Sequence, residues 1–94
     1  HLHAEYETMS LACPPESDLQ RFADILCDPA YGVLRAKGFA QVGGETLELQ
    51  TVGGRADLRP SEQASGSVGR LVVIGVKGQI DVGGLRERLA NAAA

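Results

Sequence analysis

The chain has 94 residues, a formal net charge of −3 and a sequence pI of about 5.2. Its content of 44% hydrophobic and 22% charged residues is typical of a folded domain with one modest core, not of a disordered segment. The acidic balance argues against a general binder of nucleic acid or anionic membranes, because such proteins carry a basic excess. No apolar run approaches the roughly 18 residues that a membrane-spanning helix needs.

The first residues, His1-Leu2-His3, include neither a Met nor a signal peptide. We interpret the chain as a piece of a longer protein, in which residues 1–4 are a linker or a remnant of cloning. His1 and His3 form a His-x-His pair, which can supply two imidazoles to zinc, cobalt or nickel. The alternative is a disordered end without ligands, which is the usual behaviour of a terminus.

A strand and a helix are predicted for the first third of the chain. Residues 5–12 alternate in polarity, and Cys13-Pro14-Pro15 ends this strand because proline cannot donate to a ladder. Residues 17–20 read Ser-Asp-Leu-Gln, the form of a capping box, and Asp28-Pro29 ends the helix that follows. The apolar side chains of this helix recur at helical spacing on one face: Leu19, Phe22, Ala23 and Leu26.

Two glycine pairs organise the middle of the chain. Residues 33–42 and 46–52 are predicted to form a hairpin closed by Gly43-Gly44. Gly53-Gly54 then breaks or bends the second strand, and residues 55–60 can continue it as an edge.

Within the strand 33–42, Arg35 and Lys37 are two residues apart and therefore project from one face, whereas Leu34 and Ala36 point to the other. The two cations indicate either a solvated face or a docking face for an acidic surface. Gly38 follows them directly, and this indicates a close approach of another backbone or a bulge.

The last third contains a strand and a helix. Residues 61–69 are a polar loop, and the apolar run Leu71–Ile74 predicts a central strand that is buried on both faces. Asp81 can cap the final helix, although Gly83 and Gly84 weaken its first turn. The apolar residues of this helix share one face: Val82, Leu85, Leu89 and Ala92.

The order of these elements is β-α-β-β-β-α. One sheet must bury one face, and two amphipathic helices are available to cover it. We therefore predict an α+β two-layer sandwich, with a mostly antiparallel sheet of about four strands and both helices on one face.

The two cysteines are predicted to be free thiols. Cys13 lies at the end of a strand and Cys27 at the far end of the next helix, which separates them by on the order of 15 Å. A disulfide needs Cα atoms within about 7 Å. Free thiols indicate a reducing compartment, so we expect a cytoplasmic protein in which the cysteines fill small core spaces.

The motifs of the common nucleotide-binding and hydrolytic sites are missing from the chain. It contains no GxxxxGK[ST], GxGxxG or GxSxG sequence. Its only histidines are His1 and His3, so the folded body offers no Ser/His or Cys/His pair. We predict no catalytic residues and no enzyme activity for the chain by itself.

Three segments, taken in order, resemble one family. They are VLRAKGF (33–39), LQTVGGR (49–55) and RLVVIG (70–75), the last followed by the helical LRERL (85–89). Together they resemble the C-terminal domain of the CobW-like P-loop GTPases, the cobalamin-synthesis and metal-homeostasis group. The resemblance runs from about Thr8 to Ala92 and implies that residues 1–94 are a single such domain, without the N-terminal GTPase domain.

The resemblance implies a parent protein that uses GTP, Mg and a transition metal, zinc or cobalt, to deliver metal or to support cobalamin synthesis. The domain itself would be an interaction and regulatory module, without cofactors of its own. Its partners would be the GTPase domain of the same protein and a client metalloprotein. Arg35, Lys37, Gly38 and Arg55 are the predicted partner-binding residues. Arg55, which follows Gly53-Gly54, can also bind an anion, although a bent edge strand explains those glycines.

Two alternatives from other classes stay open at the level of sequence. One is a metal-carrying domain with His1 and His3 as ligands, in keeping with the histidine-bearing linker that precedes this domain in the family. The other is a stand-alone protein that binds a small molecule.

Overall fold

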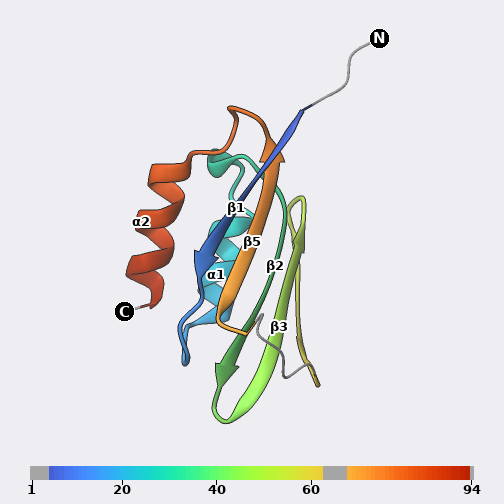
Figure 1. The fold of residues 1–94 in the computed structure, drawn as a ribbon, viewed down its shortest axis with the longest axis vertical. Helices are drawn as coiled ribbons and strands as arrows, with labels where there is room; N and C mark the ends of the chain where they lie inside the picture. Colours follow the sequence, from blue (N-terminus) through green and yellow to red (C-terminus); the bar gives the residue numbers. More distant parts are fainter. Residues whose placement is uncertain (1–4, 63–67, 94) are drawn as a thin grey trace.

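The computed structural model describes residues 5–62 and 68–93. Five strands form one antiparallel sheet in the order β1-β5-β2-β3-β4, and both helices lie on one side of it (Figure 1). The elements in chain order are β1 (Tyr6–Ala12), α1 (Leu19–Leu26), the 3-10 turn η1 (Pro29–Tyr31), β2 (Val33–Val42), β3 (Glu45–Val52), β4 (Arg55–Pro60), β5 (Arg70–Val76) and α2 (Val82–Ala93).

This architecture confirms the predicted α+β two-layer sandwich, with one more strand than the roughly four that were expected. The additional strand is β4, which the sequence suggested only as a continuation of β3. Instead, the chain reverses at Gly53-Gly54, and residues 55–60 pair antiparallel with β3 from Val52↔Arg55 to Leu47↔Pro60.

The β2–β3 hairpin forms where the sequence predicted it. Val42 pairs with Glu45, so Gly43 and Gly44 are the whole turn, with φ angles of 60° and 83°. Two successive residues with positive φ give the turn whose twist matches that of the flanking strands, and glycine adopts this conformation without strain.

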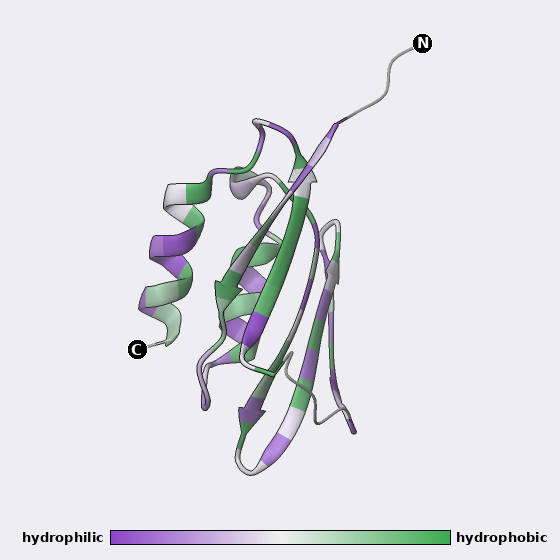
Figure 2. Cartoon of the chain, in the orientation of Figure 1, coloured by the Kyte–Doolittle hydropathy of each residue, from purple (hydrophilic) through white to green (hydrophobic). Residues whose placement is uncertain are grey.

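The core lies between the sheet and the helices. Figure 2 shows β5 as a largely hydrophobic strand, while each helix alternates between hydrophobic and hydrophilic residues. The predicted helix positions facing the sheet are confirmed, because Leu19, Phe22 and Leu26 of α1 are buried together with Leu85 and Leu89 of α2. The sheet contributes alternate strand residues: Leu11, Ala36, Ala40, Leu49, Thr51, Leu71 and Val73.

One expectation about β5 was wrong. The strand is interior to the sheet, between β1 and β2, but it is covered on one face only. Val73 is fully buried under the helices, whereas Val72 points to the other side and is 44% exposed. Both helices lie on the same side, so no helix or strand of the described residues covers the opposite face of the strand (Figure 1).

The start of α1 also differs from the prediction. Asp18, not Ser17, is the N-cap residue, and its side chain accepts a hydrogen bond from the backbone N–H of Arg21 at 3.1 Å. Ser17 is buried and donates its hydroxyl to the carbonyl of Pro14 at 2.6 Å. Gln20 donates to Asp24 and does not reach back to the cap, so the capping box does not form.

At the beginning of α2, Asp81 caps the helix as predicted, but Val82 does not join the apolar face as predicted. Asp81 accepts a hydrogen bond from the N–H of Gly84 at 3.1 Å, as a capping residue does. Val82 is exposed and does not belong to the packed face, which consists of Leu85, Leu89 and Ala92. Among the helices of the described residues, none combines the length and the hydropathy needed to cross a membrane.

Candidate interaction face of the sheet

The side of the sheet that faces away from the helices is called the uncovered face here. It carries the even-numbered side chains of β1, β3 and β5 and the odd-numbered side chains of β4, and of β2 from Arg35 onward. These sets follow from the pairing register, because residues directly opposite in adjacent strands project from the same face. Arg35, Lys37 and Arg55 all lie on this face and are exposed.

Charge is distributed unevenly between this face and the rest of the molecule. Of the nine basic residues in the chain, five lie on the uncovered face, together with only two of the twelve acidic residues, Glu48 and Asp57. Five cations and two carboxylates give this face a formal charge of +3, and the remaining four cations and ten carboxylates give the rest of the chain −6. The five basic residues are Arg35, Lys37, Arg55, Arg59 and Arg70.

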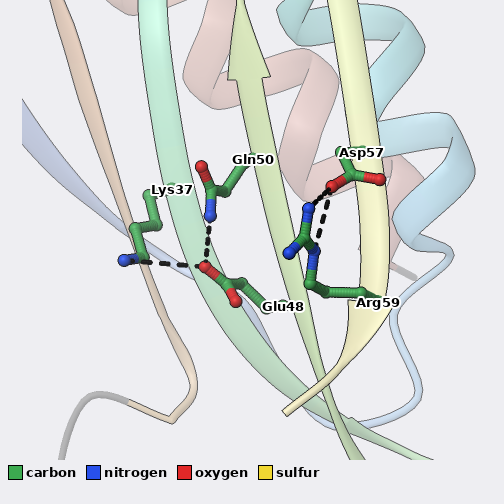
Figure 3. A network of polar contacts seen from close by, with 5 residues as sticks. All are labelled: Lys37, Glu48, Gln50, Asp57 and Arg59. Atoms are coloured by element: carbon green, nitrogen blue, oxygen red, sulfur yellow. Dashed lines mark hydrogen bonds and ion pairs between the residues drawn. The ribbon is translucent and has the colours of Figure 1, made fainter.

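Two of these cations are already paired (Figure 3). Lys37 lies 3.5 Å from a carboxylate oxygen of Glu48, which also accepts a 2.6 Å hydrogen bond from Gln50. Arg59 forms an ion pair with Asp57 on the same strand, and the hydrogen bond between them raises the pKa of Arg59. These contacts satisfy both carboxylates of the uncovered face with cations from the same face.

Arg35, Arg55 and Arg70 have no carboxylate partner among the described residues. Arg35 and Arg55 are opposite the same residue, Val52, from the two sides of β3. They therefore form a short row of two guanidinium groups with an exposed valine between them. A guanidinium group without a partner can bind a carboxylate bidentately, so this row suits an acidic ligand surface.

The uncovered face also has an apolar part next to the cations. Tyr6 is 62% exposed and Val52 is 54% exposed, and both lie on this face with Val72. Phe39 is on the same face but is buried outside the main core, and the ammonium group of Lys37 lies 5.7 Å from its ring centroid. Exposed apolar side chains beside unpaired arginines are a combination typical of protein interfaces.

Gly38 lies on the helix-covered face, where it is buried and cannot contact a partner on the uncovered face. An added Cβ atom would be 2.8 Å from the Cδ1 atom of Leu71 and 2.9 Å from the carbonyl oxygen of Arg70. The close approach of a second backbone that the sequence suggested is therefore present. The residue allows β2 and β5 to pack under the helices.

No metal or nucleophilic site was found in the part of the chain that the structure describes. His1 and His3 lie outside the described residues, and no group of three or more His, Cys, Asp or Glu side chains within them can hold a metal ion. Both cysteines are free, as predicted. Burial raises the pKa of the Cys13 thiol to about 11, and it also raises the pKa of Cys27, so both thiols are protonated at neutral pH.

Sequence reasoning missed two cations of the uncovered face. The position of Arg59 could have been predicted from the sequence, because a period of two along β4 places it on the same face as Arg55. For Arg70, no pattern in the neighbouring sequence indicated that it lies on this face. It lies opposite Phe39 of β2 and Ala12 of β1, and these pairings depend on the order of strands that are far apart in the chain.

Comparison with known proteins agrees with the fold. The Zn(II)-bound YjiA GTPase from E. coli is similar with a TM-score of 0.64 at 18% sequence identity, over 95% of this chain and 29% of that one. A Zn(II)-bound triple mutant of YjiA GTPase is similar with a TM-score of 0.63 at 19% identity, over the same shares. This chain thus spans 29% of the length of these solved structures.

The comparison with curated proteins gave no match. The family model of the cobalamin synthesis protein cobW C-terminal domain matches residues 6–93. This match includes all eight elements of the fold. The chain therefore belongs to the family of CobW C-terminal domains.

Proposed function

We propose that this chain is the interaction and regulatory domain of a longer, cytoplasmic CobW-like GTPase that delivers a metal or supports cobalamin synthesis. The domain catalyses no reaction itself. Its uncovered face docks onto an acidic surface of the GTPase domain in the same protein, and the docked state changes the rate of GTP hydrolysis. A client metalloprotein is a further partner of the whole protein.

The observation that carries this proposal is the charge of the uncovered face. A face with a formal charge of +3, on a chain whose net charge is −3, favours a negatively charged partner over another copy of the same face. Arg35 and Arg55 supply the specific contacts, because no described carboxylate neutralises them. Val52 and Val72 supply the apolar area beside them.

The family match and the structural neighbours support the chemistry that is assigned to the parent protein. Both neighbours are described as Zn(II)-bound GTPases, and this chain corresponds to a minor part of their length. We infer that GTP, Mg and zinc or cobalt bind to the part of the protein outside these 94 residues. The role of this domain is to sense or restrain that part.

The proposal is tested by reversing two charges in the full-length protein. Arg35→Glu combined with Arg55→Glu places like charges against the acidic surface. The variant should therefore hydrolyse GTP at the rate of the GTPase domain alone. GTP turnover and circular dichroism are measured for the unmodified protein, the variant and a protein truncated before this domain. A folded variant with unmodified turnover, in a protein whose turnover changes on truncation, would contradict the docking face.

A matched control carries the same change of charge elsewhere. Arg21→Glu combined with Lys77→Glu alters α1 and the turn after β5, so turnover should stay that of the unmodified protein. Equal effects of the two double variants would indicate a general response to net charge, and the specific role of the uncovered face would be rejected.

A further inference from the structure

The two edges of the sheet are protected to different degrees. Edge strand β4 has the sequence RADLRP, in which three of six residues are charged and the last is a proline. Charged side chains and proline discourage pairing with another strand. Edge strand β1, YETMSLA, contains one charged residue and no proline. Among the described strands, β1 has a neighbour on one side only, so its other side is a template for a further strand.

The hydrogen bonds to β5 show which backbone groups of β1 point outward. The N–H of Cys13 donates to Gly69 at 2.8 Å, and the carbonyl of Glu5 accepts from Lys77 at 2.9 Å. Glu5 and Cys13, which flank β1, are odd-numbered, and backbone groups alternate in direction along an antiparallel strand. The odd-numbered residues of β1 therefore direct their N–H and C=O groups towards β5. The N–H and C=O groups of the even-numbered residues therefore point to the open edge: Tyr6, Thr8, Ser10 and Ala12.

The occupant of this edge is suggested by the strand's own pattern. We propose that β1 pairs antiparallel with β1 of a second copy of this chain, about a twofold axis at Met9. In this register Tyr6 faces Ala12 of the second copy and Thr8 faces its Ser10. Every outward backbone group then finds a partner, and the outward residues form the hydrogen-bonded pairs that an antiparallel ladder requires. Registers shifted by one pair leave outward groups at the strand ends without partners.

On the helix-covered side of the sheet, a groove and a possible ion pair also favour this twofold register. A groove of about 380 Å³ lies between the end of β1, at Leu11 and Ala12, and the face of α2 that carries Arg86 and Ala90. In the twofold register Glu7 of the second copy is opposite Leu11 and reaches this groove. There its carboxylate, which in a single copy accepts a hydrogen bond from the backbone N–H of Gly78 at 3.0 Å, can turn to pair with Arg86. Arg86 has no ion-pair partner among the described residues. Symmetry makes this pair twice, as a self-complementary interface requires.

The small side chains along α2 permit α2 of the second copy to approach. Ala90 and Ala93 line the groove, and α2 lies beside β1 at this end of the helix layer (Figure 1). The dimer is a continuous sheet through both copies, in which the exposed ring of Tyr6 covers Ala12 of the second copy. Its interface does not use the arginines of the uncovered face.

The first test measures the oligomeric state of the 94-residue chain by sedimentation velocity, from about 1 µM to about 1 mM. We expect a reversible dimer that Arg86→Glu weakens at least tenfold, because the change places two carboxylates together. Arg21→Glu, the same charge change on α1, should leave the dimer intact. A monomer throughout the concentration range, or equal effects of the two variants, would overturn the proposal.

The second test determines the register by cysteine cross-linking. Opposite residues in antiparallel strands have Cα atoms within the span of a disulfide. Met9→Cys should therefore give a covalent dimer on oxidation, whereas Thr8→Cys and Ser10→Cys should not. The unmodified chain, with Cys13 and Cys27, measures the background. Cross-linking that is strongest at Thr8 or Ser10, or no stronger at Met9 than the background, would refute the twofold register and point to another occupant of the edge.

Discussion

Gly38 shows how a single residue position can be important for the fold and still lie away from the contact surface. The sequence grouped it with Arg35 and Lys37, because all three lie within residues 35–38 of a short motif. In the structure the two cations are exposed, and Gly38 is buried on the opposite face against Leu71. Neighbours in a strand alternate between faces, so a motif that is continuous in sequence serves two different purposes.

Gly38→Ala should lower the free energy of unfolding by about 2 kcal/mol, the usual cost of inserting a methyl group into a tightly packed site. The added Cβ would lie 3.0 Å from the Cα atom of Leu71 as well as close to its side chain, so the neighbour cannot yield by rotation alone. Urea unfolding measures the change. Gly54→Ala is the matched control, because a Cβ there meets nothing within 4 Å, and a similar loss in both variants would contradict this explanation.

Cys13 is expected to make stability depend on pH above neutrality. Its pKa is raised from 9.0 to about 11 in the folded chain, first by burial, while the hydrogen bond with Ser17 acts in the opposite direction. Well below pH 9, as at pH 7, the thiol is protonated in both states and has no effect. As pH rises from 9 to 11, the unfolded chain releases the proton first, and stability falls by about 1 kcal/mol at pH 10.

Urea unfolding of the native chain and of Cys13→Ala, at pH 7 and pH 10, measures this contribution. The variant should lose less stability between the two pH values than the native chain does. Cys27→Ala should resemble the native chain more closely, since Cys27 is only partly buried. A difference between Cys13→Ala and the native chain that is the same at both pH values would contradict the assignment.

At the scale of elements, α1 shows that a capping motif is decided by geometry as well as by residue types. Ser17 and Gln20 have the right identities and spacing, but the chain enters the helix one residue later. The Ser17 hydroxyl donates its hydrogen bond to the carbonyl of Pro14. The Asp18 side chain instead accepts the hydrogen bond from the backbone N–H of Arg21, which has no partner within the helix. Two adjacent residues with capping side chains made the sequence ambiguous at this point.

Asp18→Ala should destabilise the chain by about 1 kcal/mol, because α1 loses its N-cap hydrogen bond. Asp24→Ala removes the same charge from the exposed face of α1, and there we expect a change of only a few tenths of a kcal/mol. Thermal or urea unfolding of the two variants distinguishes them. If Gln20→Ala were as costly as Asp18→Ala, the capping box would be the correct description after all.

At the scale of the whole molecule, the two-layer architecture separates the chain's charges. Both helices lie on one side, so no described helix covers the other side of the five strands, and the strand order gathers five cations there. The helices, turns and loops contain most of the carboxylates. An acidic chain thereby presents a basic surface, which neither its pI nor its net charge indicated. The bulk composition argued against a general polyanion binder, but it could not reveal a local face.

The sequence by itself determined the local features: the paired glycines of the hairpin, the buried stripes of both helices, and the shared face of Arg35 and Lys37. These depend on backbone geometry within a few residues, where periods of 2.0 and 3.6 and the preferences of glycine and proline apply. Only the tertiary structure decided that Arg70 joins that face, that Val72 is exposed and that β1 is left as an open edge. Each of these depends on strand order and on which side the helices cover, and both are set by contacts between residues far apart in the chain.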